Sequence, residues 1–249
     1  IGKEIIKLKN KFKFIKFNGD IRNKSDIKKW LQGKKINFII HLAAIVPISK
    51  VNNNLKKAKE INYIGTKNLI DVIIKEKIMI DWFFFSSSSH VYRFPNKKIL
   101  LNEKTATNPG SKYGNTKLLA EKYIIKKCNN FKIPFCIGRI FSVLDIKQQK
   151  SFFFTSVLNK IKNTKKVISF KNLYHSRDFL TVQDVTRAIF HLYKKKCKGI
   201  FNIASGQELS LITIVNELCK IYKKKANIKF ESKMTYAIAN IKKIKRVGW

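Results

Sequence analysis

A tyrosine followed four residues later by a lysine can form a proton-transfer pair when both lie on a helix. At this spacing the two side chains share one helix face, and the ammonium can lower the pKa of the phenol. The spacing occurs three times in this chain, as Tyr63 with Lys67, Tyr113 with Lys117, and Tyr123 with Lys127. Because the chain has eight tyrosines and 53 lysines and arginines, chance explains such matches, and the spacing alone identifies no site.

The residues before Tyr113 separate it from the other two tyrosines. Tyr113 opens a predicted helix just after Pro109 and Gly110, and the expected strand before it ends in four serines at 86–89. Ser88 can therefore share a crevice with Tyr113 and hydrogen-bond the oxygen whose proton the phenol moves. Taken without Tyr113, the serine run is better interpreted as a polar turn.

Alternating strand and helix patterns predict the framework that positions this pair. Nearly continuous apolar runs are typical of strands buried on both faces, and apolar residues three and four apart are typical of helices. We expect strands over 12–17, 36–42, 82–85 and 135–140, and helices over 25–32, 55–76 and 111–127. Such alternation predicts an α/β fold, a Rossmann-like doubly wound parallel sheet, with ligands bound beyond the carboxyl ends of its strands.

The pattern loosens after residue 145. We expect helices over 152–162, 182–195 and 211–224, and strands over 167–170 and 199–203. The chain is therefore divided into a doubly wound domain with the catalytic helix over 1–145 and a smaller C-terminal lobe over 146–249, some segments of which return to the sheet. With 45% hydrophobic residues, both parts can contribute to a real core.

The formal charge of +38 raises the possibility of a polyanion partner. Nearly all of this charge is lysine scattered along the chain, whereas phosphate and base recognition favours arginine. This distribution favours an ordinary solvated surface and argues against nucleic acid and membrane partners. The alternative function is a non-catalytic basic protein that binds polyanions or acidic membrane surfaces. It predicts binding that falls steeply with salt and is indifferent to Tyr113→Phe.

Metal and disulfide chemistry find little support in the sequence. The four cysteines, Cys128, Cys136, Cys197 and Cys219, show no paired spacing, and no histidine pair lies near them. We therefore expect no metal site and a reducing, cytoplasmic location. The most apolar stretch, at 36–48, contains His41 and is too short to span a bilayer.

Seven segments in order resemble the extended short-chain dehydrogenase/reductase family of nucleotide-sugar enzymes, the NAD-dependent epimerase/dehydratase type. They are NGDIRN at 18–23, HLAA at 41–44, NYIGTKN at 62–68, FSSSSHVY at 85–92, YGNTKLLAE at 113–121, RDFLTVQDV at 177–185 and FNIASG at 201–206. Each match is weak alone, but seven in the correct order are specific. The resemblance implies NAD or NADP as cofactor, a nucleotide-diphosphate sugar as substrate, a substrate-binding C-terminal lobe and a homodimer.

The resemblance also implies residue roles. Ser88, Tyr113 and Lys117 would be catalytic. Asp20 would meet the adenine, Asn62 would support the site, and Arg177 would grip the sugar nucleotide's diphosphate. The complete implied cofactor set is Asp20, Ile21, Leu42, Ala43, Ala44, Asn62, Tyr113 and Lys117, and the implied substrate set is Ser88, His90 and Arg177.

Structural roles compete for several of these residues. A histidine that closes an apolar strand, such as His90, is often simply hydrogen-bonded, and Asp178 and Asp184 are also explained as helix caps. Arg139, in a buried strand, is equally explained as a member of a structural ion pair.

The implied chemistry is hydride transfer at a sugar carbon, with Tyr113 moving the hydroxyl proton. An epimerase reduces its keto intermediate on the other face, whereas a 4-keto reductase stops after one transfer. A dehydratase is disfavoured because Ser89 and His90 stand where dehydratase relatives have an Asp-Glu pair. A redox-sensing regulator would leave Ser88, Tyr113 and Lys117 idle.

The family's glycine-rich turn, where backbone N–H groups hold the pyrophosphate, has no counterpart in the sequence. We therefore expect a fragment that is truncated at both ends, lacks the first two strands of the sheet and binds the cofactor weakly. The segment that would choose between NAD and NADP is absent with the turn. Without those two strands, the strand expected over 12–17 has no neighbour.

Overall fold

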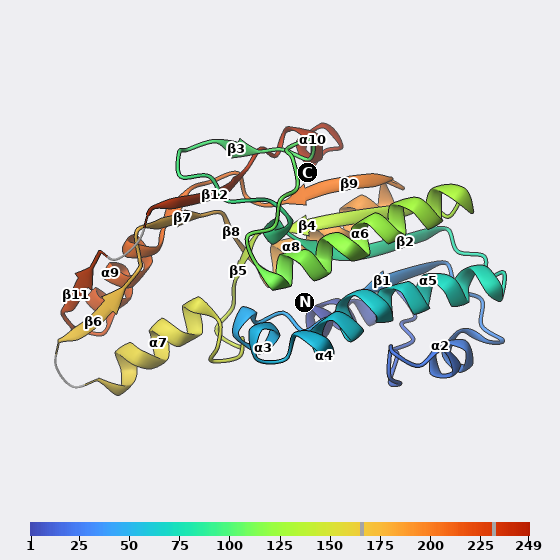
Figure 1. Ribbon diagram of the computed structural model, residues 1–249, viewed down its shortest axis with the longest axis horizontal. Helices are drawn as coiled ribbons and strands as arrows, with labels where there is room; N and C mark the ends of the chain where they lie inside the picture. The colour runs from blue at the N-terminus through green and yellow to red at the C-terminus, as the bar shows by residue number, and fades with distance from the viewer. Residues whose placement is uncertain (165–166, 231–232) are drawn as a thin grey trace.

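A four-stranded parallel sheet forms the centre of the fold, as the sequence predicts. The computed structural model describes residues 1–164, 167–230 and 233–249. The strand order is β1-β2-β4-β9, all parallel, with β1 Phe38–His41, β2 Trp82–Ser88, β4 Phe135–Ile140 and β9 Gly199–Ile203. The carboxyl ends of its strands point toward the C-terminal lobe (Figure 1).

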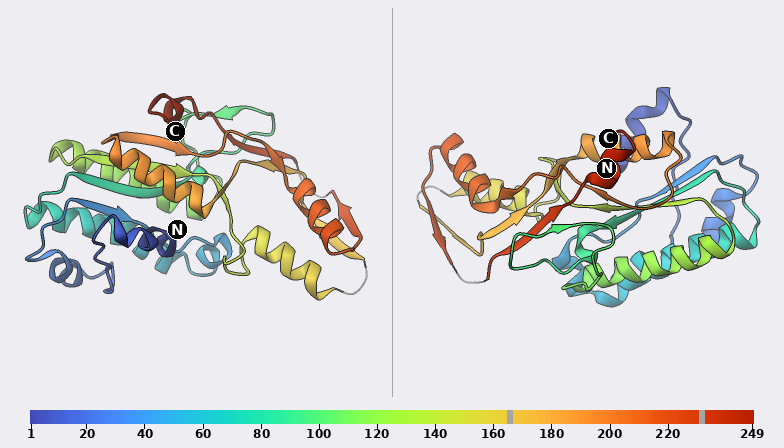
Figure 2. Two further views of the ribbon diagram at one scale, coloured as in Figure 1. Left: turned by 180° about the vertical axis from the view of Figure 1, so that it is seen from behind. Right: turned by 90° about the horizontal axis from the view of Figure 1, so that it is seen from above.

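Helices cover both faces of the sheet because its central strand is apolar on both. Trp82 and Phe84 pack into one apolar cluster, whereas Phe83 and Phe85 pack into another on the opposite face. The second cluster is covered by α5 (Thr66–Lys75) and α6 (Lys112–Asn130), with α2 (Lys24–Leu31) against α5. The first is covered by α8 (Val182–Lys194) and the short α1 (Gly2–Ile6), which is followed by η1 (Lys7–Asn10) (Figure 2).

The helix predicted over 55–76 is interrupted. The chain forms α3 (Ile48–Asn53), α4 (Leu55–Lys59), a π-helical turn η2 (Glu60–Gly65) and then α5. Asn62 lies in η2 and is completely buried. A π turn displaces side chains from the regular helical positions, so the periodicity of the segment gave no sign of it.

The C-terminal lobe has its own apolar cluster at one end of the sheet (Figure 1). It contains α7 (Phe153–Asn163), α9 (Leu211–Ile221) and the parallel pair β6 (Ile168–Lys171) and β11 (Ala226–Lys229). Two further sheets connect the lobe to the main sheet: β10 (Leu209–Ser210), β7 (His175–Arg177), β12 (Thr235–Ala239) and β3 (Leu100–Leu101), and the pair β5 (Ser142–Leu144) and β8 (Phe179–Thr181). The turn η3 (Ser89–Val91) follows β2, and α10 (Lys242–Arg246) packs on β9.

The prediction of a strand over 12–17 is wrong. Residues 13–18 form no regular structure and make no backbone–backbone hydrogen bond with any described residue. Aromatic packing holds the segment instead: Phe12 stacks on Phe190 with ring centroids 5.0 Å apart, and Phe17 packs on Trp30 at 5.3 Å. Within the described residues β1 pairs with β2 alone and forms the edge of the sheet, so the segment lies beside an edge strand without pairing with it.

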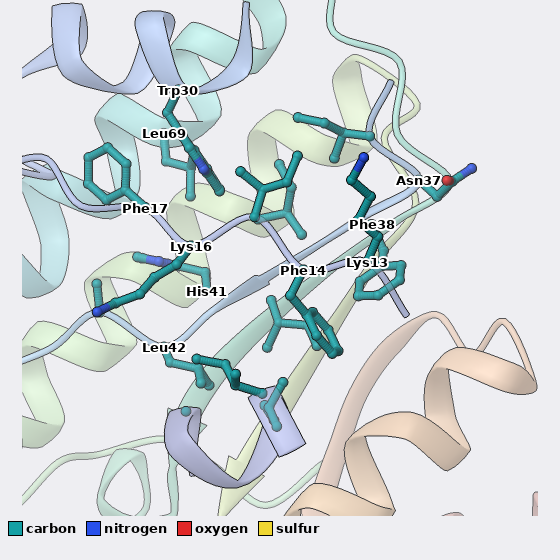
Figure 3. Close-up of a pocket in the computed structure, with 18 of the residues that line it drawn as sticks. Lys13, Phe14, Lys16, Phe17, Trp30, Asn37, Phe38, His41, Leu42 and Leu69 are labelled. Atoms are coloured by element: carbon teal, nitrogen blue, oxygen red, sulfur yellow. The ribbon is translucent and has the colours of Figure 1, made fainter. Parts of the chain in front are cut away.

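A cavity of about 620 Å³ separates this segment from β1, and we call it the edge cavity. Its walls are mostly apolar, with Phe14 and Phe17 from the segment, Trp30 from α2, and Phe38 and Ile40 from β1. Figure 3 shows Lys13 and Lys16 extending their amines from this segment away from each other. The edge cavity therefore lies where the sheet would continue.

Candidate active site

A second cavity, of about 490 Å³, lies at the carboxyl ends of β2 and β4, and we call it the site cavity. Both cavities include Leu42, which follows β1. The site cavity also contains the serine run of β2, two side chains of α6 and the cation of β7, namely Ser86, Ser87, Ser88, Tyr113, Lys117 and Arg177. The position is the one expected for a ligand in a doubly wound sheet.

The start of α6 fixes Tyr113 against the end of β2. The Ser111 side chain caps the helix by accepting a hydrogen bond from the Gly114 N–H at 3.0 Å. Gly114 allows a very close approach, because a Cβ there would lie 2.1 Å from the His90 carbonyl oxygen. The first turn of α6 thus packs directly on η3, beside Ser88.

Tyr113 is 5% exposed, and its phenol faces Ser88. Burial raises the pKa of Tyr113 to about 12, and the hydrogen bond with Ser88 opposes this shift. The sequence led us to expect the opposite direction, with Lys117 lowering the pKa of the phenol. In this structure the phenol is protonated at neutral pH and is able to donate a proton.

Lys117 is buried one turn after Tyr113. Its Nζ donates to the Ser86 carbonyl oxygen at 2.6 Å and lies 4.6 Å from the centre of the Phe85 ring. Burial lowers the pKa of Lys117 to about 7, while the charge of Glu121 raises it. The ammonium therefore titrates close to neutral pH.

The other two Tyr–Lys pairs lie outside the site cavity. Tyr123 donates its hydroxyl to Asp71, and the amines of Lys67 and Lys127 each lie 5.9 Å from its ring. These are surface contacts between neighbouring helices. Of the three tyrosines, only Tyr113 lines the site cavity, and its catalytic role stays a prediction.

Arg177 places a cation in the wall of the site cavity. Its guanidinium donates to the carbonyl oxygens of Ser176 at 2.8 Å and Thr235 at 2.9 Å, and it stacks 5.0 Å from the Phe94 ring. It forms no ion pair with a described acidic residue, and burial lowers its pKa to about 10. A partly buried cation that pairs with no described carboxylate is suited to an anionic ligand.

His90 lies between two aromatic rings in the same cavity. Its ring centroid is 5.7 Å from that of Tyr113 and 5.1 Å from that of Phe94. Burial, reinforced by the charge of Arg177, lowers the pKa of His90 to about 4, so the imidazole is neutral. No described side chain hydrogen-bonds the ring, which leaves both ring nitrogens for the cavity.

The remaining expected cofactor residues divide into three groups. Leu42 and Ala44 line the site cavity, whereas Ile21 and Ala43 line the edge cavity. Asp20 lines neither cavity. Its exposed carboxylate pairs with Arg22 at 2.5 Å, and hydrogen bonds from Arg22 lower the pKa of Asp20 to about 2.

Asn62 supports the site from behind. Its side chain accepts from the Ile45 N–H at 2.7 Å and donates to the Ile45 carbonyl at 3.0 Å and to Thr116 Oγ1 at 3.0 Å. Asn62 thus joins the loop after β1 to α6 without lining the site cavity. The supporting role of Asn62 and its place in the implied cofactor set both stay predictions.

Two buried carboxylates lie next to the site: no role was predicted for Glu121, and Asp178 was interpreted as a helix cap. Glu121 forms an ion pair with Arg139 at 2.7 Å, so the structural interpretation of Arg139 is confirmed. Asp178 is not a helix cap: it is fully buried and accepts hydrogen bonds from Ser205, Gly206 and Ala239.

Of these two carboxylates, only the burial of Glu121 could have been predicted from the sequence. An arginine in an apolar strand requires a buried acid, and Glu121 is the acidic residue that closes the YGNTKLLAE segment of α6. The other competing interpretation, that of Asp184 as a cap, is confirmed, because Asp184 completes a capping box with Thr181 at the start of α8.

Neither a metal site nor a membrane-spanning helix is found among the described residues. Among the described residues, no three His, Cys, Asp or Glu side chains gather closely enough to hold a metal ion. Within the same residues, no helix combines the length and apolar character that crossing a membrane requires.

The comparisons with known proteins agree with this geometry. The sequence pattern of the GDP-mannose 4,6 dehydratase family matches residues 2–247. The GDP-6-deoxy-D-talose 4-dehydrogenase of Aggregatibacter actinomycetemcomitans is 29% identical over 237 residues, which cover 92% of this chain and 79% of that protein. The family match therefore extends over nearly the whole chain.

Solved structures have the same fold. RMD from Pseudomonas aeruginosa, complexed with NADPH, superposes with a TM-score of 0.88 at 19% identity, covering 99% of this chain and 88% of that one. UDP-glucuronic acid 4-epimerase from Bacillus cereus, in complex with UDP-glucuronic acid and NAD, gives 0.81 at 29% identity, covering 97% and 77%. The expected fold class and family are confirmed: the chain belongs to the GDP-mannose 4,6 dehydratase family of extended short-chain dehydrogenases with a Rossmann-like fold.

Proposed function

We propose that the site cavity carries out NAD(P)-dependent hydride chemistry on a nucleotide-diphosphate sugar, as a sugar epimerase or a 4-keto-sugar reductase. One observation carries this proposal: Ser88, Tyr113 and Lys117 meet in one cavity that also contains Arg177, a cation without an ion-pair partner among the described acidic residues. Residues 1–145 hold mainly the cofactor side and residues 146–249 mainly the substrate side. Relatives with a similar chain act on GDP-linked and UDP-linked sugars.

The residues present fit the nicotinamide and ribose end of the cofactor. Tyr113 and Lys117 are the hydroxyl and amine donors on the α6 wall of the cavity, and Leu42 and Ala44 form an apolar wall. When bound, a nicotinamide supplies or accepts the hydride at the sugar carbon. The sequence contains no glycine-rich turn, so no residues are assigned to the pyrophosphate.

Tyr113 is the proposed acid and base. Its protonated phenol donates to a sugar carbonyl oxygen in the reducing direction, and Ser88 holds that oxygen through its hydroxyl. Lys117 holds the ribose through its amine, and in the oxidising direction the Tyr113 phenol accepts the sugar hydroxyl proton after losing its own. Arg177 binds the diphosphate, and the neutral imidazole of His90 hydrogen-bonds the sugar.

The reaction type follows from two positions after Ser88. A 4,6-dehydration removes water and needs both an acid and a base beside the sugar, yet Ser89 is buried and carries no charge, and His90 is neutral. The family name therefore does not decide the reaction of this chain. The proposal is epimerisation or reduction, with NAD or NADP as the cofactor. The cytoplasmic location and the homodimer that the resemblance implies stay predictions, and the homodimer is testable by sedimentation.

Turnover by matched tyrosine variants tests the proposal. The purified chain is incubated with GDP-linked and UDP-linked sugars and NAD or NADP, and sugar products are followed by NMR. Tyr113→Phe should reduce turnover by about 100-fold or more, while Tyr123→Phe, in a second Tyr–Lys pair outside the cavity, should leave it unchanged. Equal turnover by the two variants would contradict the assignment of Tyr113.

A further inference from the structure

Glu121 is the residue of α6 that lies one turn beyond Lys117. It is 1% exposed, and both of its carboxylate oxygens are engaged. Ser87 donates its hydroxyl to Oε1, and Arg139 donates through Nε to Oε1 at 3.1 Å and through a terminal nitrogen to Oε2 at 2.7 Å. The carboxylate thus binds β2 on one side and β4 on the other.

Three contacts of α6 on the end of β2 occur in helical register. Tyr113 meets Ser88, Lys117 bonds to the Ser86 carbonyl, and Glu121 bonds to the side chain of the serine between them, Ser87. Residues 113, 117 and 121 lie four apart and so share one face of the helix. Glu121 is the only one of the three that is also tied to another strand.

The bond to β4 continues into a buried chain of hydrogen bonds. Arg139 donates to the Tyr92 hydroxyl at 2.9 Å, and that hydroxyl donates to Asn202 on β9 at 2.8 Å. Arg139, Tyr92 and Asn202 are at most 3% exposed. Tyr92 lies two residues after His90, so the same chain of bonds also holds the segment behind the cavity.

Apolar packing alone does not fix the position of α6 along the sheet. Ala120 and Ile124 pack into the cluster on that face, but such burial is non-directional, and it tolerates small sliding or rolling of a helix. Directional bonds to a charged group resist these movements. In addition, a buried ion pair is often replaceable by apolar residues without loss of stability, so stability gives little reason for one here.

We propose that Glu121 is a positioning residue of the Tyr113–Lys117 pair: through Ser87 and Arg139 it fixes α6 over the end of β2, and so sets the contact between Tyr113 and Ser88. This inference rests on the proposed function of the site. Glu121 touches neither substrate nor cofactor, and its effect passes through the two residues that do.

The charge of Glu121 gives the proposal a second readout. The groups that face Lys117 are the neutral His41 on β1, the Phe85 ring and Ser86 carbonyl on β2, and Tyr113 and Glu121 on α6. Glu121 is the acid whose charge raises the pKa of Lys117. Removing that charge should therefore lower the pKa of Lys117 further.

The test uses tyrosine labelled with ¹³C at Cζ in the full 249-residue chain, with the Tyr113 resonance assigned by Tyr113→Phe. The variants are Glu121→Gln, which keeps the shape but loses the charge, and Glu121→Asp, which keeps the charge but not the reach. Glu217→Gln on α9, where Glu217 pairs with Lys220 at the surface, is the matched control. Circular dichroism establishes that each variant is folded.

We expect both Glu121 variants to shift the Tyr113 resonance and to lower kcat by about tenfold to 100-fold, with KM changed less than about threefold. In Glu121→Gln the step in the Tyr113 resonance that reports loss of the Lys117 proton should also move to lower pH. Glu217→Gln should behave as wild type. A folded Glu121→Gln with the wild-type resonance, titration and kcat would overturn the proposal.

Two further measurements ensure that the test gives a clear result. If Glu121→Gln does not fold, Ser87→Ala removes one bond and leaves the Glu121–Arg139 pair intact; a shifted Tyr113 resonance then supports the proposal, and an unshifted one overturns it. The proposed function fails separately, when Tyr113→Phe keeps full turnover. The NMR readout requires no turnover, so it judges Glu121 in either case.

Discussion

The edge cavity and the site cavity meet at Leu42 but are built in different ways. The larger, of about 620 Å³, lies between an unpaired extended segment and an edge strand, and its walls are mostly aromatic and aliphatic. The smaller, of about 490 Å³, lies at the ends of paired strands, and its walls include Ser88, Tyr113, Lys117 and Arg177. The volume of a cavity therefore does not by itself indicate which of the two is the candidate active site.

The two cavities also differ in how their polar groups are held. Lys13 and Lys16 extend from the edge cavity without a shared partner (Figure 3). Around the site cavity, Lys117 and Arg177 are bonded to strand carbonyls, and Tyr113 to Ser88. Fixed groups with perturbed pKa values are more frequent at active sites than elsewhere, whereas an apolar gap at a sheet edge is typical of incomplete strand pairing.

The largest effect on stability should come from Asp178, which is fully buried between two residues of the site-cavity wall, Arg177 and Phe179. Asp178→Asn replaces one acceptor oxygen by an NH₂ group, which then faces either the Ser205 N–H or the N–H groups of Gly206 and Ala239. Leaving these buried donors unsatisfied should lower the free energy of unfolding by about 3 kcal/mol, measured by urea titration. Asp184→Asn, at an exposed helix cap, should cost about 1 kcal/mol or less. Equal losses would contradict the difference in burial.

Gly114→Ala should damage the site through a steric clash. The new Cβ would lie 2.1 Å from the His90 carbonyl oxygen, so α6 or η3 must move. We expect about 2 kcal/mol of lost stability and a loss of turnover that is larger than the stability change explains. The control is Gly110→Ala in the same loop, where nothing lies within 4 Å of the new Cβ. Wild-type turnover by Gly114→Ala would show that the close approach of Gly114 to the His90 carbonyl is not required for activity.

Lys117→Met should reveal by how much burial of the Lys117 ammonium lowers the free energy of unfolding. The folded pKa of Lys117 is about 7, below the ordinary value of about 10.4, so the unfolded chain holds more protons between these values. Wild-type stability should therefore rise with pH across that window. The variant should be more stable than wild type at pH 6 by about 1–2 kcal/mol, and this advantage should shrink toward pH 10. A difference that does not change with pH would contradict the burial of a charged Lys117.

The smallest effect should come from filling the edge cavity. Ile40→Phe adds apolar volume to the wall that β1 contributes. It should raise the free energy of unfolding by about 0.5–1 kcal/mol and leave turnover unchanged, as measured by urea titration and by product NMR. Loss of turnover in this variant, with the fold intact, would mean that the two cavities are functionally one.

The long apolar elements were predictable, and those that depend on distant partners were not. The bounds of β4 and β9 match the prediction to the residue, because a short, mostly apolar run between turn residues leaves few alternatives. The segment 12–17 has an equally good strand pattern but lacks a partner, and a pattern alone does not supply one. The two- to five-residue strands β3, β7, β10 and β12 exist only through pairing with each other.

The sequence predicted which side chains of β2 and α6 lie together at the candidate site, but not the residues that support them. Tyr113 stood out by its position after a serine-ended strand, and the structure brings it to Ser88. Asp20 did not reach a cavity, because the nearby Arg22 binds its carboxylate instead. Asp178 was missed because its partners at 205, 206 and 239 are distant in sequence and mostly backbone N–H groups, which no sequence pattern marks.

Hydrogen exchange measured by mass spectrometry tests most directly whether ligand binds in the site cavity rather than in the edge cavity. Exchange is compared with and without GDP-mannose or UDP-glucuronic acid, each together with NAD or NADP. The account predicts slower exchange on ligand addition at 86–92, at the start of α6 and around Arg177, and no change over 13–17. Protection confined to 13–17 and β1, with the serine strand and α6 unaffected, would contradict it.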